Sequence, residues 1–399
     1  MADLQIKGNK IALIDSSDNI IYTLPDSAGA LGKALVSDGA GKLSYGGINI
    51  DSVLATGNTA NRGINVDTLT VNTLNTSKLF NQQPQTFSFQ GSTSGYASGG
   101  STNTITRQNT IDKFPFSTDA NATDVGDLTQ SRDTSAGQSS STHGYTAGGF
   151  DPTGAGPTQP SHRKTIDKFS FASDGDATDV ADISGGYGTA LCAGTSSATN
   201  GYIIPGKVPP IGHGARYIQK FPFAADNPSR DVSYHADRTT ESMGGHSSNT
   251  HGYSSGGRRF PGAGNPSSRS PISDITKFSM VVDTLLSDVG DLTEGTSAHS
   301  AQSSTTHGYA TGGFPNFKLK IQKFSFASDG NAADIANLSL NVGSGSGQSS
   351  TTHGYNSGGE TPPSAEGPRI QKFPFATDAD ATEVGDLTQG RSHSAEQQV

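Results

Sequence analysis

Apolar residues in this chain occur in short alternating groups and not at helical spacing. In the segment Ile321–Phe326, the two phenylalanines fall on one face of an extended strand, while the isoleucine and a lysine fall on the other. No stretch sustains apolar residues at three- and four-residue intervals, which is the pattern that predicts a helix. The chain is therefore predicted to be all-β and built from short strands.

One unit recurs six times, and each copy contains Gly-Tyr, then Gly-Gly, an Ile-x-Lys-Phe-x-Phe segment and a Val-Gly-Asp-Leu segment or variants of these. The Gly-Tyr pairs begin at Gly95, Gly144, Gly201, Gly252, Gly308 and Gly354. The first phenylalanines of the Lys-Phe segments are Phe114, Phe169, Phe221, Phe278, Phe324 and Phe373. Successive pairs lie 46 to 57 residues apart, and each unit has room for four strands. This period is typical of propeller blades, so residues 85–399 are predicted to form a six-bladed β-propeller.

The fifth unit shows the expected strands most clearly. They are Ala298–Ser304, His307–Gly313, Ile321–Phe326 and Ala333–Leu338. The first strand is rich in small residues, as expected for inner strands that crowd around an axis. The Gly-Gly that ends the second strand permits positive φ or a close backbone approach. Because each sheet would lie between two others, both of its faces can be buried.

The C-terminal segment predicts how the ring closes. Ser392–Gln397 repeats the pattern of Ala298–Ser303, which is a first strand, whereas the first unit begins with its second strand near Ser94. We expect the C-terminal strand to complete the first blade and so remove an open sheet edge. Thr86–Gln90, which directly precedes the first blade, is the alternative donor of this strand.

The first 84 residues contain no copy of the unit. Leu4–Lys7, Lys10–Asp15 and Asn19–Leu24 are predicted strands separated by turn residues. Such a segment has few large apolar side chains and cannot bury a generous core alone. We expect it to gain stability by association with copies of itself or by docking on a larger assembly.

Composition and charge exclude several classes of function. The chain has 27 basic and 36 acidic residues in 399, a net charge of −9, which argues against a nucleic-acid-binding surface. Cys192 is the only cysteine, so an internal disulfide and a cysteine zinc site are excluded. No apolar run reaches the roughly 18 residues that span a bilayer, and the N-terminus lacks the pattern of a secretion signal. We therefore expect synthesis in a cytoplasm and no membrane insertion.

Four histidines recur at matched positions and raise the question of a metal site. They are His143, His251, His307 and His353. Asn200 and Ser94 stand at the corresponding positions of the other two units, so a ring of imidazoles would be incomplete. Repetition at a turn favours a structural role.

Carboxylates and amides at alternate positions suggest calcium ligands in the turn before the fourth strand. The sets are Asp119, Asn121 and Asp124; Asp174, Asp176 and Asp179; Asp329, Asn331 and Asp334; and Asp378, Asp380 and Glu383. Tight hairpins favour the same residue types, so the pattern leaves the turn interpretation and the calcium interpretation open. We find no nucleophile elbow, phosphate loop or zinc-protease motif. Tyr187 and Cys192 lie near each other in the sequence, as in a copper enzyme with a modified cysteine, but no set of copper ligands accompanies them. We expect no enzyme activity, no metal and no cofactor.

Three loops between second and third strands differ from unit to unit in length and composition: Phe150–Thr165, Arg258–Asp274 and Phe314–Lys320. Variable loops on an invariant frame are typical of a binding surface, although tolerated surface loops would vary in the same way. Aromatic rings can stack on sugars, and cations can pair with anionic groups. The candidate receptor-binding residues are Phe150, His162, Arg163, Arg258, Arg259, Phe260, Phe314, Phe317 and Lys318.

The order of the unit, including an arginine after the fourth strand at Arg132 and Arg391, resembles the kelch repeat. The resemblance covers about four fifths of the chain and implies a kelch-like propeller. The sequence departs from kelch in having no tryptophan, whose packing role would fall to Val or Leu.

A second resemblance concerns the N-terminal region. The segment Leu24–Tyr45 looks like the N-terminal anchor of tail fibres and related virion proteins of marine phages, particularly those that infect cyanobacteria. Ser52–Asn61 and Val66–Leu74 are similar to fibre shafts, and the Ser-Ser-Thr-Thr-His-Gly-Tyr segments resemble repeats in structural proteins of the same viruses. The implied domains are a virion-attachment β domain at 1–47, a shaft at 48–84 and the propeller at 85–399.

This resemblance implies a virion protein that is made in the host cytoplasm and trimerises through its N-terminal region. Its implied partners are other tail, neck or baseplate proteins and a glycan or protein of the host surface. Host attachment is the favoured function. The alternative is a structural fibre or decoration of the neck, capsid or baseplate with no receptor of its own, and a cellular kelch-type interaction module is the third class.

Overall fold

The structure is a computed structural model that describes part of the chain in detail. The described residues are 3–7, 10–14, 20–23, 34–37, 43–46, 89–102, 106–153, 161–185, 188–204, 206–208, 213–214, 217–234, 240–259, 270–282 and 285–399. Their regular structure is entirely β, and none of them belongs to a helix that could cross a membrane. The all-β prediction is therefore confirmed. Contacts divide the chain into two units, Met1–Lys78 and Leu79–Val399, which we describe separately.

The first unit contains two small antiparallel sheets. One has the order β1 (Asp3–Lys7), β2 (Lys10–Ile14) and β3 (Ile20–Thr23), and the other pairs β4 (Ala34–Ser37) with β5 (Leu43–Gly46). The first three strands match the predicted ones to within one residue at each end. The last two strands were not predicted, and the predicted shaft at 48–84 lies outside the described residues.

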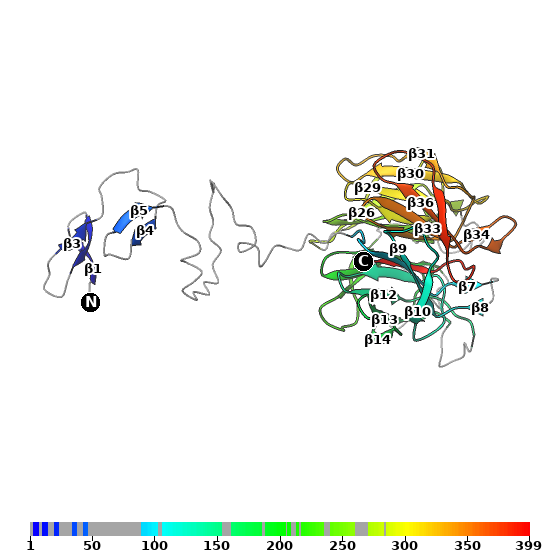
Figure 1. The fold of residues 1–399 in the computed structure, drawn as a ribbon, viewed down its shortest axis with the longest axis horizontal. Coiled ribbons are helices and arrows are strands. Elements are labelled where there is room, and N and C mark those ends of the chain that lie inside the picture. The colour runs from blue at the N-terminus through cyan, green and yellow to red at the C-terminus, as the bar shows by residue number, and fades with distance from the viewer. Residues whose placement is uncertain are drawn as a thin grey trace. The chain divides into compact units, whose positions relative to one another are not determined.

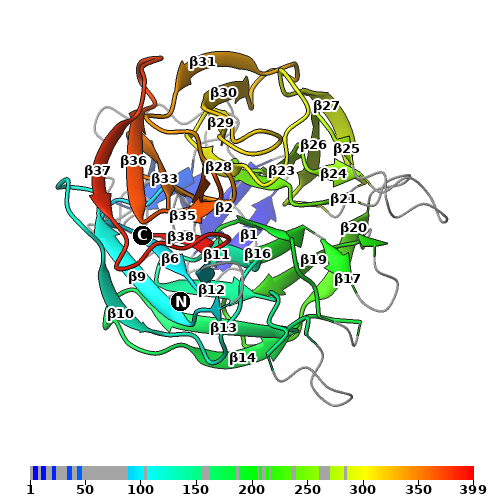
Figure 2. The same cartoon turned by 90° about the vertical axis from the view of Figure 1, so that its right-hand side faces the viewer.

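The described part of the second unit contains six antiparallel sheets of four strands, seen side by side in Figures 1 and 2. Sheet 1 consists of β38 (Ala395–Gln398), β6 (Ser94–Ser98), β9 (Thr110–Pro115) and β10 (Thr123–Asp127). Sheet 2 consists of β11 (Ala136–Ser139), β12 (His143–Ala147), β13 (Thr165–Ser170) and β14 (Thr178–Asp182). Sheet 3 consists of β15 (Ala193–Ser196), β16 (Asn200–Ile204), β19 (Tyr217–Pro222) and β20 (Arg230–Tyr234).

Sheets 4 to 6 repeat the same order of a first, second, third and fourth strand. Sheet 4 consists of β22 (Gly244–Ser247), β23 (His251–Ser255), β26 (Asp274–Ser279) and β27 (Ser287–Asp291). Sheet 5 consists of β28 (Ser300–Ser303), β29 (His307–Thr311), β30 (Lys320–Ser325) and β31 (Ala333–Asn337). Sheet 6 consists of β32 (Ser346–Ser349), β33 (His353–Ser357), β36 (Arg369–Pro374) and β37 (Thr382–Asp386).

Nine strands of two residues each lie in the connections between these elements. They are β7 (Ser101–Thr102), β8 (Thr106–Arg107), β17 (Lys207–Val208), β18 (His213–Gly214), β21 (Thr240–Glu241), β24 (Arg258–Arg259), β25 (Ser270–Pro271), β34 (Glu360–Thr361) and β35 (Ala365–Glu366). The count refers to the described ranges given above.

The C-terminus completes sheet 1, as predicted. Strand β38 pairs with β6, so that Ala395 lies opposite Ser98 and Gln398 lies opposite Gly95. The described residues of Thr86–Gln90, the alternative donor of this strand, do not pair with β6. The chain just after this segment instead forms a bridge from Gly91 to Ser350 of sheet 6.

A cycle of backbone hydrogen bonds connects the residues that precede the first strands. In each sheet the amide of this residue donates to the carbonyl of its counterpart in the preceding sheet, over 2.7–2.9 Å. The donor and acceptor pairs are Thr134 and His393, Leu191 and Thr134, Ser242 and Leu191, Ala298 and Ser242, Ser344 and Ala298, and His393 and Ser344. All six residues have positive φ, between 48° and 58°, a conformation that L-residues adopt only at a cost. The hydrogen bonds to both neighbours offset that cost.

The first strands approach one another so closely that side chains are excluded at one position. A Cβ on Gly194 would overlap the carbonyl of Gly137 in sheet 2, and one on Gly137 would overlap the backbone of Glu396. This explains the small residues in the first strand of each unit, which the sequence predicted. The residues at this position are Gly137, Gly194, Gly245, Ala301, Gly347 and Glu396.

Neighbouring sheets interlock through aromatic rings. The tyrosine of each Gly-Tyr pair packs on the Lys-Phe phenylalanine of the next sheet, with ring centroids 5.5–5.9 Å apart. The pairs run from Tyr96 with Phe169 to Tyr355 with Phe114, which joins sheet 6 to sheet 1. Tyrosine and phenylalanine therefore fill much of the space assigned to Val or Leu in the sequence analysis, although leucines such as Leu387 add to the same clusters.

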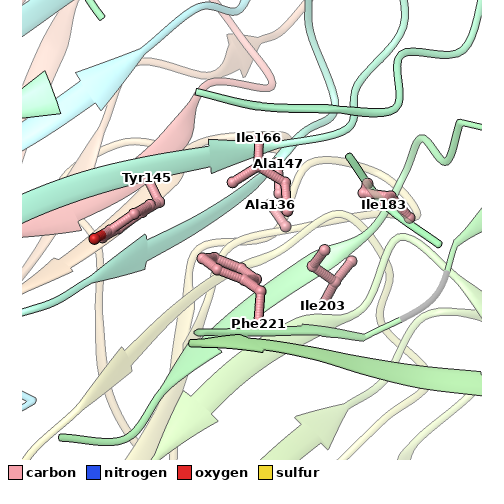
Figure 3. Close-up of a cluster of buried hydrophobic side chains, with 7 residues drawn as sticks. All are labelled: Ala136, Tyr145, Ala147, Ile166, Ile183, Ile203 and Phe221. Carbon is pink, nitrogen blue, oxygen red and sulfur yellow. The ribbon is translucent and has the colours of Figure 1, made fainter. Parts of the chain in front are cut away.

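The glycine of each Gly-Tyr pair has a separate task. It lies directly opposite the phenylalanine of the third strand in its own sheet, as Gly144 does opposite Phe169. A Cβ there would overlap the aromatic ring, so glycine lets the ring lie flat on the neighbouring strand. Figure 3 shows the result between sheets 2 and 3, where Tyr145, Ile166 and Phe221 lie in one buried cluster. Residues on both faces of the first and second strands are buried, as predicted, whereas the fourth strands are largely exposed or half-buried.

Two arginines form buried ion pairs between sheets. Arg391, which follows the fourth strand of sheet 6, lies 2.8 Å from Asp112 on the third strand of sheet 1, and Arg132 pairs with Asp167 in the same way between sheets 1 and 2. All four side chains are fully buried. At the other four interfaces the arginine and the aspartate are both replaced. The replacements are Thr189 with Gln219, Thr240 with Thr276, Thr296 with Gln322 and Val342 with Gln371.

We predict that Gly194→Ala lowers the free energy of unfolding by about 2 kcal/mol or more, because the added methyl must push two first strands apart. Urea denaturation followed by tyrosine fluorescence measures this, since the chain has no tryptophan. Gly367→Ala is the control, because a Cβ there meets no atom closer than 3.7 Å. Equal effects of the two substitutions would contradict the close approach.

We also predict that Arg391→Val lowers the free energy of unfolding by about 3–5 kcal/mol, because it leaves the Asp112 carboxylate buried without its partner. The double variant Asp112→Gln with Arg391→Val copies the natural Val342 and Gln371 pair and should recover most of the loss. Urea denaturation of both variants checks this. A double variant as unstable as the single one would show that the two residues are not coupled.

Candidate functional site

The two ends of the sheets differ in the length of the connections that they carry. We call the end that carries the connections 99–109, 148–164, 205–216, 256–273, 312–319 and 358–368 the loop face. We call the opposite end, which carries the short turns 140–142, 197–199, 248–250, 304–306 and 350–352, the turn face. The chain enters at the turn face, where Gly91 bridges to Ser350 and the amide of Thr93 donates to Val399. The loop face is therefore the end away from the preceding segment's point of entry.

The first group of candidate residues lies at the loop face of sheets 1 and 2. Phe150 and His162 form a bridge, with their rings 5.2 Å apart, and the guanidinium of Arg107 lies 5.2 Å from the centre of the Phe150 ring. Arg107 also pairs with Asp133 at 3.0 Å. Phe150 is half-buried, and His162 is buried, with a pKa lowered by burial and by Lys207.

Arg163 is tied to the same loop. Its guanidinium lies 3.1 Å from the Asp151 carboxylate, which also accepts hydrogen bonds from Thr153. These donors hold the pKa of Asp151 below its ordinary value although burial opposes them. This part of the loop face is thus a packed aromatic and charged cluster.

The second group lies at the loop face of sheet 5. The rings of Phe314 and Phe317 pack at a tilt of 57° with their centroids 4.8 Å apart, and both residues are half-buried. Lys318 is buried: its ammonium donates to the carbonyl of Gly295 and to Thr296, and pairs with Glu294 at 3.1 Å. Lys318 therefore holds sheets 4 and 5 together, which leaves the phenylalanines as the accessible part of this loop.

The third group begins the long connection of sheet 4. Arg258 donates from Nε to Ser297 over 3.0 Å, and Arg259 lies 2.8 Å from Asp274 with 40% of its side chain exposed. Phe260 lies outside the described residues. The structure thus places eight of the nine candidates at one face in three separate groups, and does not gather them into one site.

The recurring histidines form part of the turns on the turn face. His143 accepts or donates at Nδ1 with Thr142 over 2.8 Å, and its amide donates to Ser140. His251, His307 and His353 repeat both contacts. The described residues contain no cluster of three or more histidine, cysteine, aspartate or glutamate side chains suited to a metal.

The calcium-like pattern connects neighbouring sheets. Asp174 of sheet 2 pairs with Lys113 of sheet 1 at 2.9 Å, and Asp176 accepts a hydrogen bond from the amide of Asp127 at 3.0 Å. The same two contacts recur for Asp329 and Asn331, for Asp378 and Asp380, and for Asp119 and Asn121. These partly exposed contacts join neighbouring sheets, and we call them the inter-sheet latch. They explain why aspartate and asparagine recur in the turns, and each ion pair adds about 0–1 kcal/mol to the free energy of unfolding.

A cavity that the sequence analysis missed lies among the first strands at their loop-face end. Its volume is about 70 Å³, and residues from all six sheets line it. Cys192, His299, His393 and Glu396 are the titratable residues in its wall. The small residues of the first strands predicted a crowded axis. The sequence signal for a functional group in this cavity was Glu396, which stands where the other first strands have glycine or alanine, and the sequence analysis did not consider it.

Burial sets the protonation states in this cavity. It raises the pKa of Glu396 from 4.5 to about 8, and it lowers the pKa of His299 to about 3. It also raises the pKa of the Cys192 thiol to about 12, and the nearby Glu396 adds to that rise. Near neutrality the cavity therefore holds a neutral thiol, a neutral His299 and a carboxyl close to its titration point.

No protein-family model matches the sequence, and no curated protein sequence is significantly similar to it.

We predict a loss of stability at high pH that depends on Glu396. Because its pKa is raised on folding, the folded state holds this proton more tightly, so the stabilisation is complete below pH 4.5 and is lost as the pH rises through about 8. The free energy of unfolding of the wild type should therefore fall relative to that of Glu396→Gln between about pH 5 and about pH 8, while the histidines, whose pKa values are lowered by burial, act equally in both proteins. Urea denaturation across this range measures it.

The other groups in the cavity wall do not obscure this result. His299 acts in the opposite direction, because its pKa falls from 6.5 to about 3 on folding and it therefore raises the free energy of unfolding up to about pH 6.5, but it does so in both proteins. The thiol of Cys192 titrates above the range, and His393 is present in both proteins. Parallel curves for wild type and Glu396→Gln would mean that Glu396 is not buried as described.

Proposed function

We propose that the six sheets form a closed, six-bladed, kelch-like β-propeller. The cycle of hydrogen bonds from Thr134 round to His393 supports this, as does the contact of β38 with both β32 and β11. The repeated tyrosine and phenylalanine contacts, including Tyr355 with Phe114, support the same arrangement.

On this platform we propose that the protein is a phage virion fibre protein that attaches to the host surface. The observation that carries the proposal is the position of the variable loops at the loop face, away from the entry of the chain at Gly91 and Thr93. A protein held at its N-terminal side would present this face outward. Phe317 and Arg259 are two of the half-buried candidates, suited to a sugar ring and an anionic group of a host glycan or protein.

The N-terminal region would attach the propeller to the tail, neck or baseplate and would associate as a homotrimer. Several copies would raise the total affinity of weak single sites. This part of the proposal depends on the resemblance of residues 24–74 to phage anchors and shafts.

One observation favours the second candidate function, a structural decoration protein without a receptor. Most of the candidate side chains are engaged inside the protein, as His162, Arg163 and Lys318 are. Such engagement is expected of loops that only cap the sheets.

We predict that the labelled full-length protein adsorbs to marine cyanobacterial cells, and that Arg259→Ala with Phe317→Ala reduces the bound fraction about fivefold or more, since few residues dominate a binding surface. Flow cytometry over a panel of strains measures this. Val281→Ser with Val282→Ser is the control, because these side chains are 73% and 59% exposed in the hairpin before β27, at the turn face.

Two results would contradict host attachment. One is equal adsorption by both double variants, provided that thermal denaturation shows both to be folded. The other is adsorption to none of the strains together with immunogold labelling on the capsid or neck, which would favour the decoration protein.

A further inference from the structure

A chain of hydrogen bonds fixes one acceptor in the wall of the central cavity. The carbonyl of Gln302 can only accept, so His246 donates to it from Nδ1 over 3.1 Å. Burial lowers the pKa of His246 to about 4, so the ring is neutral and its Nε2 accepts from the Ser255 hydroxyl over 2.8 Å. Having used its one hydrogen, Ser255 must accept from Nε2 of His299 over 2.9 Å.

His299 is therefore a neutral ring whose proton is on Nε2. Its Nδ1 carries a lone pair and is buried without a hydrogen-bond partner among the described residues, while the residue as a whole is 5% exposed. His299 is part of the cavity wall. A buried acceptor without a donor is costly unless something in the cavity supplies one.

Glu396 is the second acceptor. It stands where the other five sheets have glycine or alanine, and it lines the same cavity. Among the described residues only its own backbone amide is found to donate to its carboxyl, no ion pair with it is found, and the cavity wall contains no lysine or arginine. Glu396 is half-buried, and an ionised carboxylate that is partly removed from water is costly unless it is paired.

The six backbone amides of the hydrogen-bond cycle, whose residues line the cavity, do not supply the missing donors. The amides of Thr134, Leu191 and the four equivalent residues all donate within the hydrogen-bond cycle. The hydroxyls of Ser135 and Ser344 are also buried without partners and line the cavity, and a hydroxyl can donate or accept. The cavity thus combines two fixed acceptors, one of them ionisable, with two adaptable hydroxyls.

We propose that this cavity binds a small ammonium-type cation, such as a primary amine, which donates hydrogen bonds to Glu396 and to Nδ1 of His299. The volume of about 70 Å³ admits a molecule the size of methylammonium together with ordered water. The neutral thiol of Cys192 and the side chain of Met243 form an apolar part of the wall against which the methyl group can pack. The inference does not depend on host attachment.

The test is isothermal titration of the full-length protein with methylammonium chloride at about pH 9. At this pH Glu396 is ionised, since its pKa is about 8, and an alkylammonium with a pKa near that of lysine, ~10.4, keeps its charge. We expect saturable binding to the wild type. Tetramethylammonium chloride at equal ionic strength should show none, because it has no N–H donor, and sodium chloride should show none for the same reason.

Matched variants separate the cavity from general electrostatics. Glu396→Gln should weaken the affinity for methylammonium by about tenfold or more, because it removes the charge and keeps the shape. Glu396→Gly, which restores the residue of four other sheets, should do the same. Glu383→Gln removes an equal charge from an exposed ion pair with Arg369 and should change the affinity by less than about twofold.

Each other outcome would overturn the proposal. Binding of sodium or tetramethylammonium as tight as that of methylammonium would show that donated hydrogen bonds play no part. Equal affinities of wild type and Glu396→Gln, with both proteins folded, would place the cation elsewhere. No heat of binding and no rise in thermal stability with methylammonium would mean that the cavity holds water alone.

Discussion

The close approach of six inner strands is the constraint on which the second unit depends. Where Gly137 and Gly194 face the neighbouring backbone, no side chain fits, so the inner strands are held by backbone hydrogen bonds and by small polar residues. The large apolar side chains are displaced outward, where tyrosine of one sheet packs on phenylalanine of the next. The glycine of the Gly-Tyr pair follows from the same geometry, because the phenylalanine ring needs the space above it. One repeated motif thus serves packing within a sheet and packing between sheets.

The polar contacts between neighbouring sheets differ from one interface to the next. Buried ion pairs such as Arg391 with Asp112 cost desolvation, and uncharged pairs such as Val342 with Gln371 replace them elsewhere in the same protein. Because arginine and aspartate change together, neither is left at an interface without the opposite charge of the other. The latch between Lys113 and Asp174 is exposed and weak by comparison, and its value lies in fixing the register of neighbouring sheets.

The fold was predictable because its signals are local and repeated. The strand boundaries of the fifth unit, the Gly-Gly turns and the C-terminal strand of sheet 1 were all read from matched positions in the sequence. The site was less predictable, since exposure depends on partners that are distant in sequence. Lys318 looked like a binding cation, and only the structure shows that Glu294 and the carbonyl of Gly295 engage it. The aspartates of the turns looked like calcium ligands because a lysine about 50 residues earlier cannot be assigned as their partner from spacing alone.

The central cavity shows why departures from a repeat deserve more weight than the repeat itself. A first strand with glutamate in place of glycine breaks the pattern at the position where neighbouring backbones approach most closely, and burial there raises the pKa of Glu396 because an unpaired charge is costly. Neither packing nor an ion pair among the described residues compensates for it. The neutral His299, whose tautomer is fixed through Ser255, His246 and the carbonyl of Gln302, faces the same space with a second unpaired acceptor. Two acceptors in the wall of one cavity call for a donor, and the ionisable one calls for a positive charge on it.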